Sequence, residues 1–487
     1  MKKLLLLLNL LLASTYTVFG QAEGSVVSAT ARGGVATTMV TDYQSIGINP
    51  ANLGLRSKYE TKHVTFGLLE MNASAFAKGV TTQQMKDLFF NGSTLSPSSQ
   101  AQAANLFAGN NISANVDLML LGLAIQSDKM GGLAFSVNDV VRGNGNLSQN
   151  FTNFAFSGGL STQYFDKLKL NNGSTVANDP NQYNNYNSIG IDSALSTNGV
   201  SLGQVFKGSD VKAQYYRTFN VAYGREVFRN DVFNVSVGVG VKYVMGYYYM
   251  NIQSKDGELQ GHVADNPVIS SLSNSFNVPN KSNGGNIISP AGQGAGFDIG
   301  VTAVVYDKLK LGASVVNIGG IKYTQNTYDV KDTTIHALNY DASTGDAFNQ
   351  TVYWKSTSSF TAKLPTMLRM GASLSLFEEK VEIGGDIIVP LNKEAGNINK
   401  AIFALGGDLY VKRWFKVSTG ASIGGNYANS VEGYSTHVCV PFGFTLIAGE
   451  NGGWEFGMST RDIVSLIDIN GKSPLYSAGL CMFRFRV

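Results

Sequence analysis

The residues that could do chemistry in this 487-residue chain occur in the wrong local context for catalysis. The segment GASIG at 420–424 matches the pattern G-x-S-x-G, in which Ser422 would be a hydrolase nucleophile. That pattern requires a sharp turn from a strand into a helix. Ser422 instead falls inside an alternating apolar and polar stretch, with Ile423 on the opposite face. We therefore expect no catalytic residue and no enzymatic activity.

Glycine-rich segments give no nucleotide site either. The segment GQGAG at 292–296 lacks the strand-then-helix context of a dinucleotide-binding loop, and NGKS at 470–473 lacks the glycine of a P-loop. The net charge is +3 and no block of Lys or Arg occurs, so electrostatic binding of nucleic acid has no support. We expect neither a cofactor nor a nucleic-acid partner.

Histidine and cysteine are too sparse for a metal centre or a disulfide framework. The four His residues show no metal-ligand spacing, and His63 and His437 each precede an outward valine, which predicts that they line an interior. Only Cys439 and Cys481 occur; we place the first inward and the second outward on separate strands. We predict no metal site and no disulfide.

The elements that must position these residues are long two-faced strands. In residues 233–243 apolar side chains occupy odd positions, and small or polar ones occupy even positions. Soluble strands average about 5–6 residues, whereas tilted membrane strands need about 9–11. Similar segments recur, 119–125 among them, and we count about fourteen by this alternation. Weaker alternation at 150–160 and around Tyr353 would raise the count to about sixteen, but we place both in loops.

Short and long connections alternate between these strands, as in outer-membrane barrels. The long connections lie near 70–114, 142–212, 250–293, 325–365 and 392–400, among others. Charged residues are 15%, below the usual level of about 25%. Aromatic residues lie beside the short turns, where a girdle at the membrane surface belongs. These features predict an all-β fold, a transmembrane antiparallel β-barrel of about 14 strands.

Charged residues within the strands mostly fall opposite the apolar face. An Arg or Lys that faces lipid at mid-membrane costs about 2–4 kcal/mol, so we expect these side chains to face the lumen. There they would tie an enclosed segment to the wall or line a path. The predicted lumen-lining residues are His63, Lys242, Asp298, Arg369, Asp386, Asp408, His437, Arg484 and Arg486.

The N-terminal 60 residues differ from the strands. Residues 1–20 combine a basic start with a short apolar run, which predicts a secretory signal peptide. Residues 21–60 are rich in Gly, Ala and Thr and carry the turn signal Asn49-Pro50, and Asn52 can bond to nearby main chain. We predict a hatch or plug over 21–60 within a barrel over 61–487.

The segment ARGGVATT…DYQSIGINPANLGL resembles the N-terminal signature of the long-chain fatty-acid transporter (FadL) superfamily. It looks closer to the Bacteroidota branch that includes PorV and uncharacterised relatives. The resemblance implies a fourteen-stranded barrel with an N-terminal hatch in the outer membrane of a Gram-negative bacterium. Carried over, the hatch residues would be Arg32, Asp42, Asn49, Pro50, Ala51 and Asn52. Two features depart from the pattern: the helices expected at 82–108 and the terminal Val487.

Two functions remain open. The first is passive transport of small hydrophobic or amphipathic molecules, by displacement of the hatch or through a gap in the wall near Asn138-Asp139; it predicts a continuous apolar path. The second is a PorV-like accessory barrel for protein secretion, with a sealed lumen and ordered loops at 142–212 and 250–293 that bind a secreted protein or surface partner. A soluble secreted adhesin is a third, weaker alternative. The first two predict contact with outer-membrane lipid.

Overall fold

The computed structural model describes twelve stretches of the chain. They are residues 26–55, 63–78, 81, 104–127, 129–157, 160–266, 278–279, 289–339, 352–425, 438–449, 453–467 and 475–487. The expected signal peptide (1–20) and His437 therefore lie outside the described residues. Of the helices expected at 82–108, only residues 104–108 fall in a described stretch, and 104–107 are helical.

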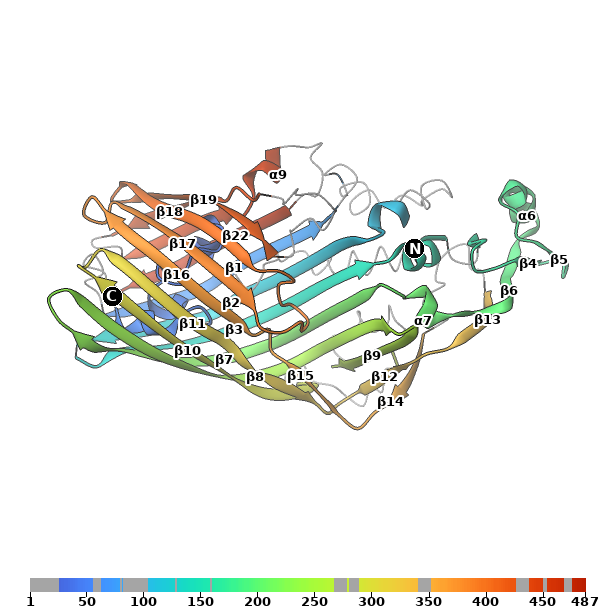
Figure 1. Cartoon of the computed structure of the whole chain (residues 1–487), viewed down its shortest axis with the longest axis horizontal. Helices are drawn as coiled ribbons and strands as arrows, with labels where there is room; N and C mark the ends of the chain where they lie inside the picture. The colour runs from blue at the N-terminus through green and yellow to red at the C-terminus, as the bar shows by residue number, and fades with distance from the viewer. Residues whose placement is uncertain are drawn as a thin grey trace.

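Fourteen antiparallel strands in the described residues form a closed barrel, which confirms the predicted fold class (Figure 1). Pairing of the first strand with the last closes the ring. In ring order the strands are β1 (Val64–Ala77), β2 (Asn110–Ser127), β3 (Gly131–Leu147), β7 (Asp210–Arg229), β8 (Phe233–Lys255), β10 (Gly292–Val305), β11 (Leu309–Tyr323), β16 (Met367–Leu376), β17 (Val381–Pro390), β18 (Ile402–Lys412), β19 (Phe415–Gly424), β20 (Phe442–Ala448), β21 (Trp454–Thr460) and β22 (Leu475–Arg486).

Short and long connections alternate around the ring, so the barrel has a short-turn end and a long-loop end. Several strands continue past the limits expected from the sequence, because their final residues are small or polar on both faces and show no alternation. β3, for example, continues through Gly143, Asn144, Gly145 and Asn146 to Leu147. Residues 149–157 form helix α5 (Gln149–Ser157), and Tyr353 begins β14 (Tyr353–Ser356), which pairs with β12 (Thr327–Lys331). Both segments lie outside the fourteen-strand ring.

The outer face of the barrel is apolar and the inner face is polar. On β8, Val237, Val239 and Val241 are 42%, 55% and 49% exposed, whereas Ser236 and Lys242 are buried. A closed ring pairs every backbone group of the wall and leaves no sheet edge, which is what a hydrocarbon environment requires. Among the described residues, no helix combines the length and apolar character needed to cross a membrane.

Three neighbouring strands interrupt the alternation of inward and outward side chains at the same height in the barrel wall. In β22, β1 and β2 two consecutive residues lie outside the buried set, namely Met482-Phe483, Leu68-Leu69 and Leu120-Leu121. Beyond this point each strand presents its other set of side chains to the lumen. Leu69 has a φ of 54°, in the left-handed region, which allows the reversal. As a result Cys481 faces inward, contrary to our expectation; it is buried, and no disulfide joins it to Cys439.

At the long-loop end the connections fold into a domain with its own apolar core, which we call the loop domain (residues 148–209, 256–265 and 327–339; Figure 1). A second sheet has the order β13 (Thr334–Asn339), β6 (Ile191–Ser201), β4 (Lys167–Leu170) and β5 (Thr175–Ala177). β9 (Glu258–Asp265) and β12 extend the wall beyond β8. The remaining helices of this domain are η5 (Pro180–Gln182), α6 (Tyr183–Ile189) and α7 (Leu202–Val205).

The core of the loop domain is well packed. Phe154, Phe165, Leu168 and Val205 are essentially fully buried. Burial raises the pKa of Tyr164 to about 12, and its hydroxyl donates to the Asn150 carbonyl at 2.9 Å. A segment expected to be mainly connection is therefore a folded unit in its own right.

Candidate functional site

Residues 26–55 fold as three short helices against the inner face of the ring. They are α2 (Val27–Ala31), η2 (Asp42–Ser45) and η3 (Pro50–Gly54), drawn in dark blue inside the short-turn half of the barrel (Figure 1). Polar side chains of β8, β10, β17, β18 and β22 bond to this segment, so its partners come from widely separated strands.

Asp386 of β17 holds the middle of the segment. Its Oδ2 accepts from the Ala36 and Thr37 amides at 3.0 and 2.9 Å and from the Thr37 hydroxyl at 2.6 Å. Arg369 of β16 lies 3.5 Å from the same oxygen and donates to the Gly34 carbonyl at 3.0 Å. Both charged side chains are fully buried, and a carboxylate that accepts several hydrogen bonds is a strong anchor.

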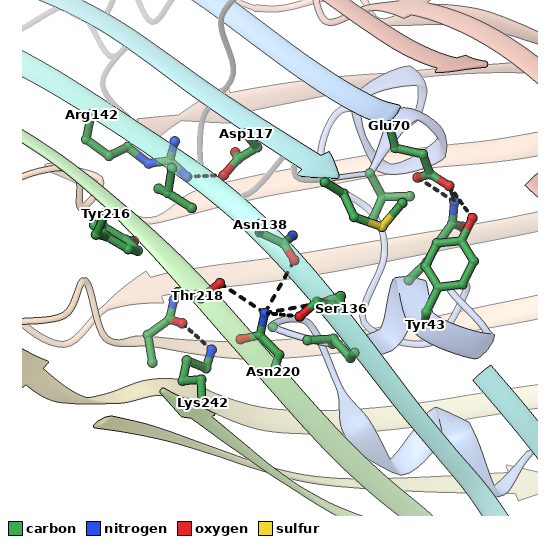
Figure 2. Close-up of a pocket in the computed structure, with 17 residues that line it drawn as sticks. Tyr43, Glu70, Asp117, Ser136, Asn138, Arg142, Tyr216, Thr218, Asn220 and Lys242 are labelled. Atoms are coloured by element: carbon green, nitrogen blue, oxygen red, sulfur yellow. Dashed lines mark hydrogen bonds and ion pairs between the residues drawn. The ribbon is translucent and has the colours of Figure 1, made fainter. Parts of the chain in front are cut away.

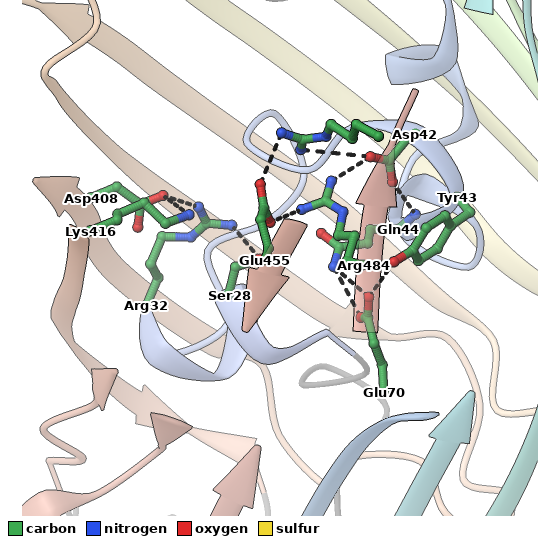
Figure 3. Close-up of polar contacts among 11 residues, drawn as sticks. Ser28, Arg32, Asp42, Tyr43, Gln44, Glu70, Asp408, Lys416, Glu455 and Arg484 are labelled. Atoms are coloured by element: carbon green, nitrogen blue, oxygen red, sulfur yellow. Dashed lines mark hydrogen bonds and ion pairs between the residues drawn. The ribbon is translucent and has the colours of Figure 1, made fainter. Parts of the chain in front are cut away.

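A second tie joins Arg32 to the wall (Figure 3). Its Nη1 lies 2.8 Å from Asp408 Oδ2, and both side chains are buried. Asp408 also accepts from Ser418 at 2.6 Å and lies 3.4 Å from Lys416. The Arg32 Nε donates to the Val35 carbonyl at 2.9 Å, which fixes the turn after α2.

The third tie lies at the start of η2 (Figure 3). Asp42 forms an ion pair with Arg484, and Arg486 lies 3.8 Å from the same carboxylate. Glu455 completes the cluster at 2.7 Å from Arg484 and 2.9 Å from Arg486. Asp42 has a positive φ of 49°, a conformation that Asp tolerates better than most residues. The cluster has two acids and two bases.

Asn49, Pro50, Ala51 and Asn52 form the turn into η3. The Asn49 side-chain oxygen accepts from the Ala51 amide at 3.2 Å, so it caps the helix that Pro50 begins. The Asn49 amide donates to Thr302 of β10 at 2.8 Å, and the Thr302 hydroxyl donates to Asn52 at 2.8 Å. The motif therefore joins its own backbone to the wall.

Glycine in the wall permits this close approach. A Cβ on Gly238 of β8 would lie 2.2 Å from the Pro50 carbonyl carbon, and one on Gly300 of β10 would lie 2.0 Å from Asn49 Oδ1. Ser236 of β8 donates to the Ala51 carbonyl at 2.6 Å. The wall strands thus leave room for η3 where their small residues face inward.

The remaining residues singled out in the sequence divide between the lumen and the rim. Lys242 of β8 lies 3.0 Å from Asp298 of β10, both buried, and donates to Asn317 at 2.6 Å. His63 instead lies just before β1 and is exposed, with its ring nitrogen 2.9 Å from the Gln126 carbonyl, because the strand begins one residue later.

Glu70 is the interior residue that the alternation misses. We expected it at the start of the connection 70–114, but β1 continues to Ala77, and the irregularity at Leu69 turns Glu70 inward. Its carboxylate accepts from the Tyr43 hydroxyl at 2.5 Å and from the Gln44 amide at 3.0 Å (Figure 3). In the sequence, the available signal for this inward position was an acidic residue at the end of an apolar run.

A chamber remains between the segment and the wall strands β2, β3, β7 and β8 (Figure 2). Its lining is mainly polar and differs from the continuous apolar path that one hypothesis expects. It is lined by Val26, Tyr43, Gln44, Ile46, Gly47, Glu70, Asp117, Met119, Ser136, Asn138, Val140, Arg142, Tyr216, Thr218, Asn220, Lys242 and Asn317. The volume of the chamber is about 80 Å³.

Hydrogen bonds order the chamber wall (Figure 2). Asn220 donates to Ser136 at 3.1 Å, to Thr218 at 2.9 Å and to Asn138 at 3.3 Å. Arg142 and Asp117 form an ion pair at 2.6 Å at the side nearer the long-loop end. Side chains with both donors and acceptors can bind a polar group of a solute.

The wall has no gap at Asn138-Asp139, contrary to one route considered from the sequence. β3 pairs with β2 and with β7 at both residues. Asp139 forms a bidentate ion pair with Arg217 of β7 at 2.7 and 2.8 Å, on the face opposite the chamber. Within the described residues, no group of three or more His, Cys, Asp or Glu side chains is placed to hold a metal ion.

These features define a closed, apolar-faced β-barrel with an N-terminal segment bonded to its inner wall. A family model described as a family of unknown function (DUF5723) matches residues 184–449, which is more than half of the chain. The chain therefore belongs to this family. No curated protein matches it.

Several solved structures are similar to the chain. The Pseudomonas putida toluene transporter TodX is 11% identical with a TM-score of 0.41, covering 96% of this chain and 98% of its own. The Ralstonia pickettii toluene transporter TbuX is 12% identical with a TM-score of 0.42, covering 97% and 100%. A Pseudomonas aeruginosa FadL homologue is 12% identical with a TM-score of 0.40, covering 94% and 96%.

Proposed function

We propose that this protein is a barrel of the Gram-negative outer membrane that allows passive passage of small hydrophobic or amphipathic molecules, amphipathic ones above all. Residues 26–55 are its hatch. The apolar outer face suits a lipid bilayer, and the inner ties keep the hatch in the lumen at rest. The solved structures similar to the chain include FadL-type channels.

The observation on which the proposal depends is the chamber beside the hatch. Asn138, Asn220 and Lys242 offer donors and acceptors for a polar group, whereas Val140 and Tyr216 offer apolar contact. A lining of both kinds favours an amphipathic solute over a purely apolar one, because an apolar solute would leave the polar groups unpaired.

The hatch is held by polar contacts that can break without loss of the barrel. The side chains of Asp386 and Asp408 bond to the segment from two strands, and these contacts are separate from the backbone pairing of β17 and β18 within the ring. Movement of the segment away from these carboxylates would connect the chamber to the short-turn end.

Flux through reconstituted protein tests the proposal. We reconstitute wild type and a hatch variant, Arg32→Ala/Asp386→Ala, in liposomes and measure the entry of external butanesulfonate. This amphipathic anion crosses bilayers poorly. We expect entry to rise at least about tenfold, because each lost charged hydrogen bond is worth about 1.5–3 kcal/mol. Heat-modifiable gel mobility checks that the barrel is folded.

The matched control is Lys169→Ala, which removes an ion pair at the surface of the loop domain, where both side chains are about half exposed. The rate of butanesulfonate entry through this variant should equal that of wild type. If butanesulfonate does not enter through the hatch variant, the transport proposal is wrong.

The loop domain favours a second candidate, a PorV-like accessory role in protein secretion. Its buried core, around Phe154 and Phe165, is larger than connections alone require. If this second function is right, a partner protein should be recovered when the protein is isolated from membranes, and butanesulfonate should not enter through any variant. Recovery that persists after deletion of residues 160–200 would count against it.

A further inference from the structure

The connection between β17 and β18 folds into the lumen instead of away from the barrel. We call residues 391–400 the strap. Ala395, Asn397 and Ile398 are only 1%, 2% and 3% exposed, although they belong to a connection at the long-loop end. Connections usually lie at the surface, since a buried one must satisfy its own backbone groups.

The base of the strap is fixed to residues 364–366, which lead into β16. Asn392 donates to the Leu364 carbonyl at 2.7 Å, and Asn397 donates to the Thr366 carbonyl at 3.0 Å. Asn397 also bonds back to the carbonyl of Asn392 at 3.0 Å, which closes the loop on itself. Two asparagine side chains therefore replace the strand pairing that ends at Pro390.

The tip of the strap reaches across the lumen. Gln214 of β7 donates to the Ala395 carbonyl, and Lys212 donates to the Lys393 carbonyl at 3.3 Å. The Gly396 amide lies 3.5 Å from Asn144 Oδ1 on β3. In the ring β7 is separated from β17 by β8, β10, β11 and β16, so the strap joins distant parts of the wall.

Glycine is required where the strap meets β3. Gly396 has a φ of +81°, and a Cβ there would lie 2.5 Å from the Cβ of Arg142. No side chain fits between the strap and the Arg142–Asp117 ion pair. The strap thus rests directly on the charged end of the chamber.

The strap covers the side of the chamber that faces the long-loop end. Along β3 the lining runs from Ser136 to Arg142, and the strap contacts Arg142 and Asn144 next along the strand. Along β7 the lining ends at Tyr216, and the strap contacts Gln214. Ala395 also packs in an apolar cluster with Val140, Tyr216, Tyr249 and Tyr323, among others.

We propose that the strap sets the size limit for solutes that enter the chamber from the long-loop end. The contacts of Ala395 with Gln214 and of Gly396 with Arg142 determine the aperture. This inference rests on the proposed transport function and adds to it: the hatch controls exit toward the short-turn end, whereas the strap determines which solutes reach the chamber.

A series of neutral sugars tests the size limit. Liposome-swelling assays measure the entry of glucose, maltose, maltotriose and maltopentaose through four proteins. Two have the native hatch and two have the Arg32→Ala/Asp386→Ala hatch. Within each pair, one protein keeps the native strap and the other has residues 393–398 replaced by Gly-Gly. In the hatch variant, strap shortening should raise maltotriose entry severalfold and leave glucose entry nearly unchanged. A matched Gly-Gly replacement of residues 171–174, an exposed turn of the loop domain, should change neither.

A reversible link provides the opposite test. Ala395→Cys/Gln214→Cys, in a hatch variant that also carries Cys439→Ser/Cys481→Ser, is bridged by a short bis-methanethiosulfonate, which forms a disulfide with each cysteine and releases methanesulfinate. We expect the bridge to reduce sugar entry severalfold and dithiothreitol to restore it.

The outcomes separate the two claims. If sugars enter through the hatch variant but neither shortening nor bridging changes the dependence on sugar size, the strap inference is wrong and transport stands. If no sugar enters even with the strap shortened, while butanesulfonate enters through the hatch variant, the strap inference is wrong and transport stands; if neither enters, transport itself is wrong. Entry only when hatch and strap are both altered would support the strap as a barrier in its own right.

Discussion

At the scale of single residues, the interior depends on charges that are buried in pairs. Asp386 and Arg369 are both fully buried, and Asp386 also accepts three hydrogen bonds from residues 36 and 37. Loss of one member of a buried pair costs about 3–5 kcal/mol, because the other charge remains in a poorly solvating environment. Exposed pairs are worth about 0–1 kcal/mol.

Asp386→Asn should therefore loosen the segment 26–55. We expect amide hydrogen exchange in residues 34–40 to accelerate by about two orders of magnitude, which corresponds to about 3 kcal/mol. Asp192→Asn is the matched control, since Asp192 pairs with Lys169 at 3.2 Å at an exposed site of the loop domain. Equal exchange of residues 34–40 in the two variants would contradict the anchoring role of Asp386.

At the scale of elements, the long strands could be predicted from the sequence, and their irregularities could not. Alternation in β8 continues for more than ten residues, so its two faces are clear. The reversal at Leu69 and Leu120 leaves no comparable signal, since Leu fits an apolar face at either position. That is why Met119 was expected to face outward and Glu70 was placed in the connection 70–114, whereas both lie inside the barrel.

Long-range contacts account for the rest of what the sequence did not show. The turn at Asn49-Pro50 is local and readable, but the partners Thr302 and Ser236 are about 250 and 185 residues away. The strap likewise looked like an ordinary connection, because its inward course depends on Gln214 and Arg142 of other strands.

Element packing gives a prediction for η3. Gly238→Ala places a Cβ 2.2 Å from the Pro50 carbonyl carbon, so η3 must shift away from β8. We expect a loss of about 1–3 kcal/mol in the unfolding free energy, as is usual for overpacking, together with faster entry of butanesulfonate. Gly145→Ala serves as the control, because the nearest atom to its added Cβ, the Asp210 carbonyl oxygen, would be 3.4 Å away. Identical denaturation midpoints would show that η3 does not lie against β8.

At the scale of the whole molecule, the apolar outer face requires lipid. Val239 lies within the row of exposed apolar side chains that runs from Phe233 to Tyr243 on β8 and is 55% exposed, whereas Val227 lies near the short turn at the end of β7 and is 58% exposed. A barrel in a bilayer distinguishes these depths, but a soluble barrel would treat both positions as surface.

Val239→Arg should therefore destabilise the protein in lipid vesicles by about 2–4 kcal/mol, and Val227→Arg by about 0–1 kcal/mol. Equilibrium unfolding in guanidinium chloride with vesicles of one lipid composition measures both. Similar small effects at the two positions would argue for a soluble secreted protein.

The central claim is that residues 26–55 lie inside the closed ring, and cross-linking tests it most directly. In a Cys439→Ser/Cys481→Ser background, Asn49→Cys is combined with Thr302→Cys, which faces inward, or with the neighbouring Val301→Cys, which faces outward. A short bifunctional thiol reagent should link residue 49 to residue 302 and not to residue 301. A link to 301 would place the segment outside the ring, and absence of both links in folded protein would separate residue 49 from β10; either result contradicts the account.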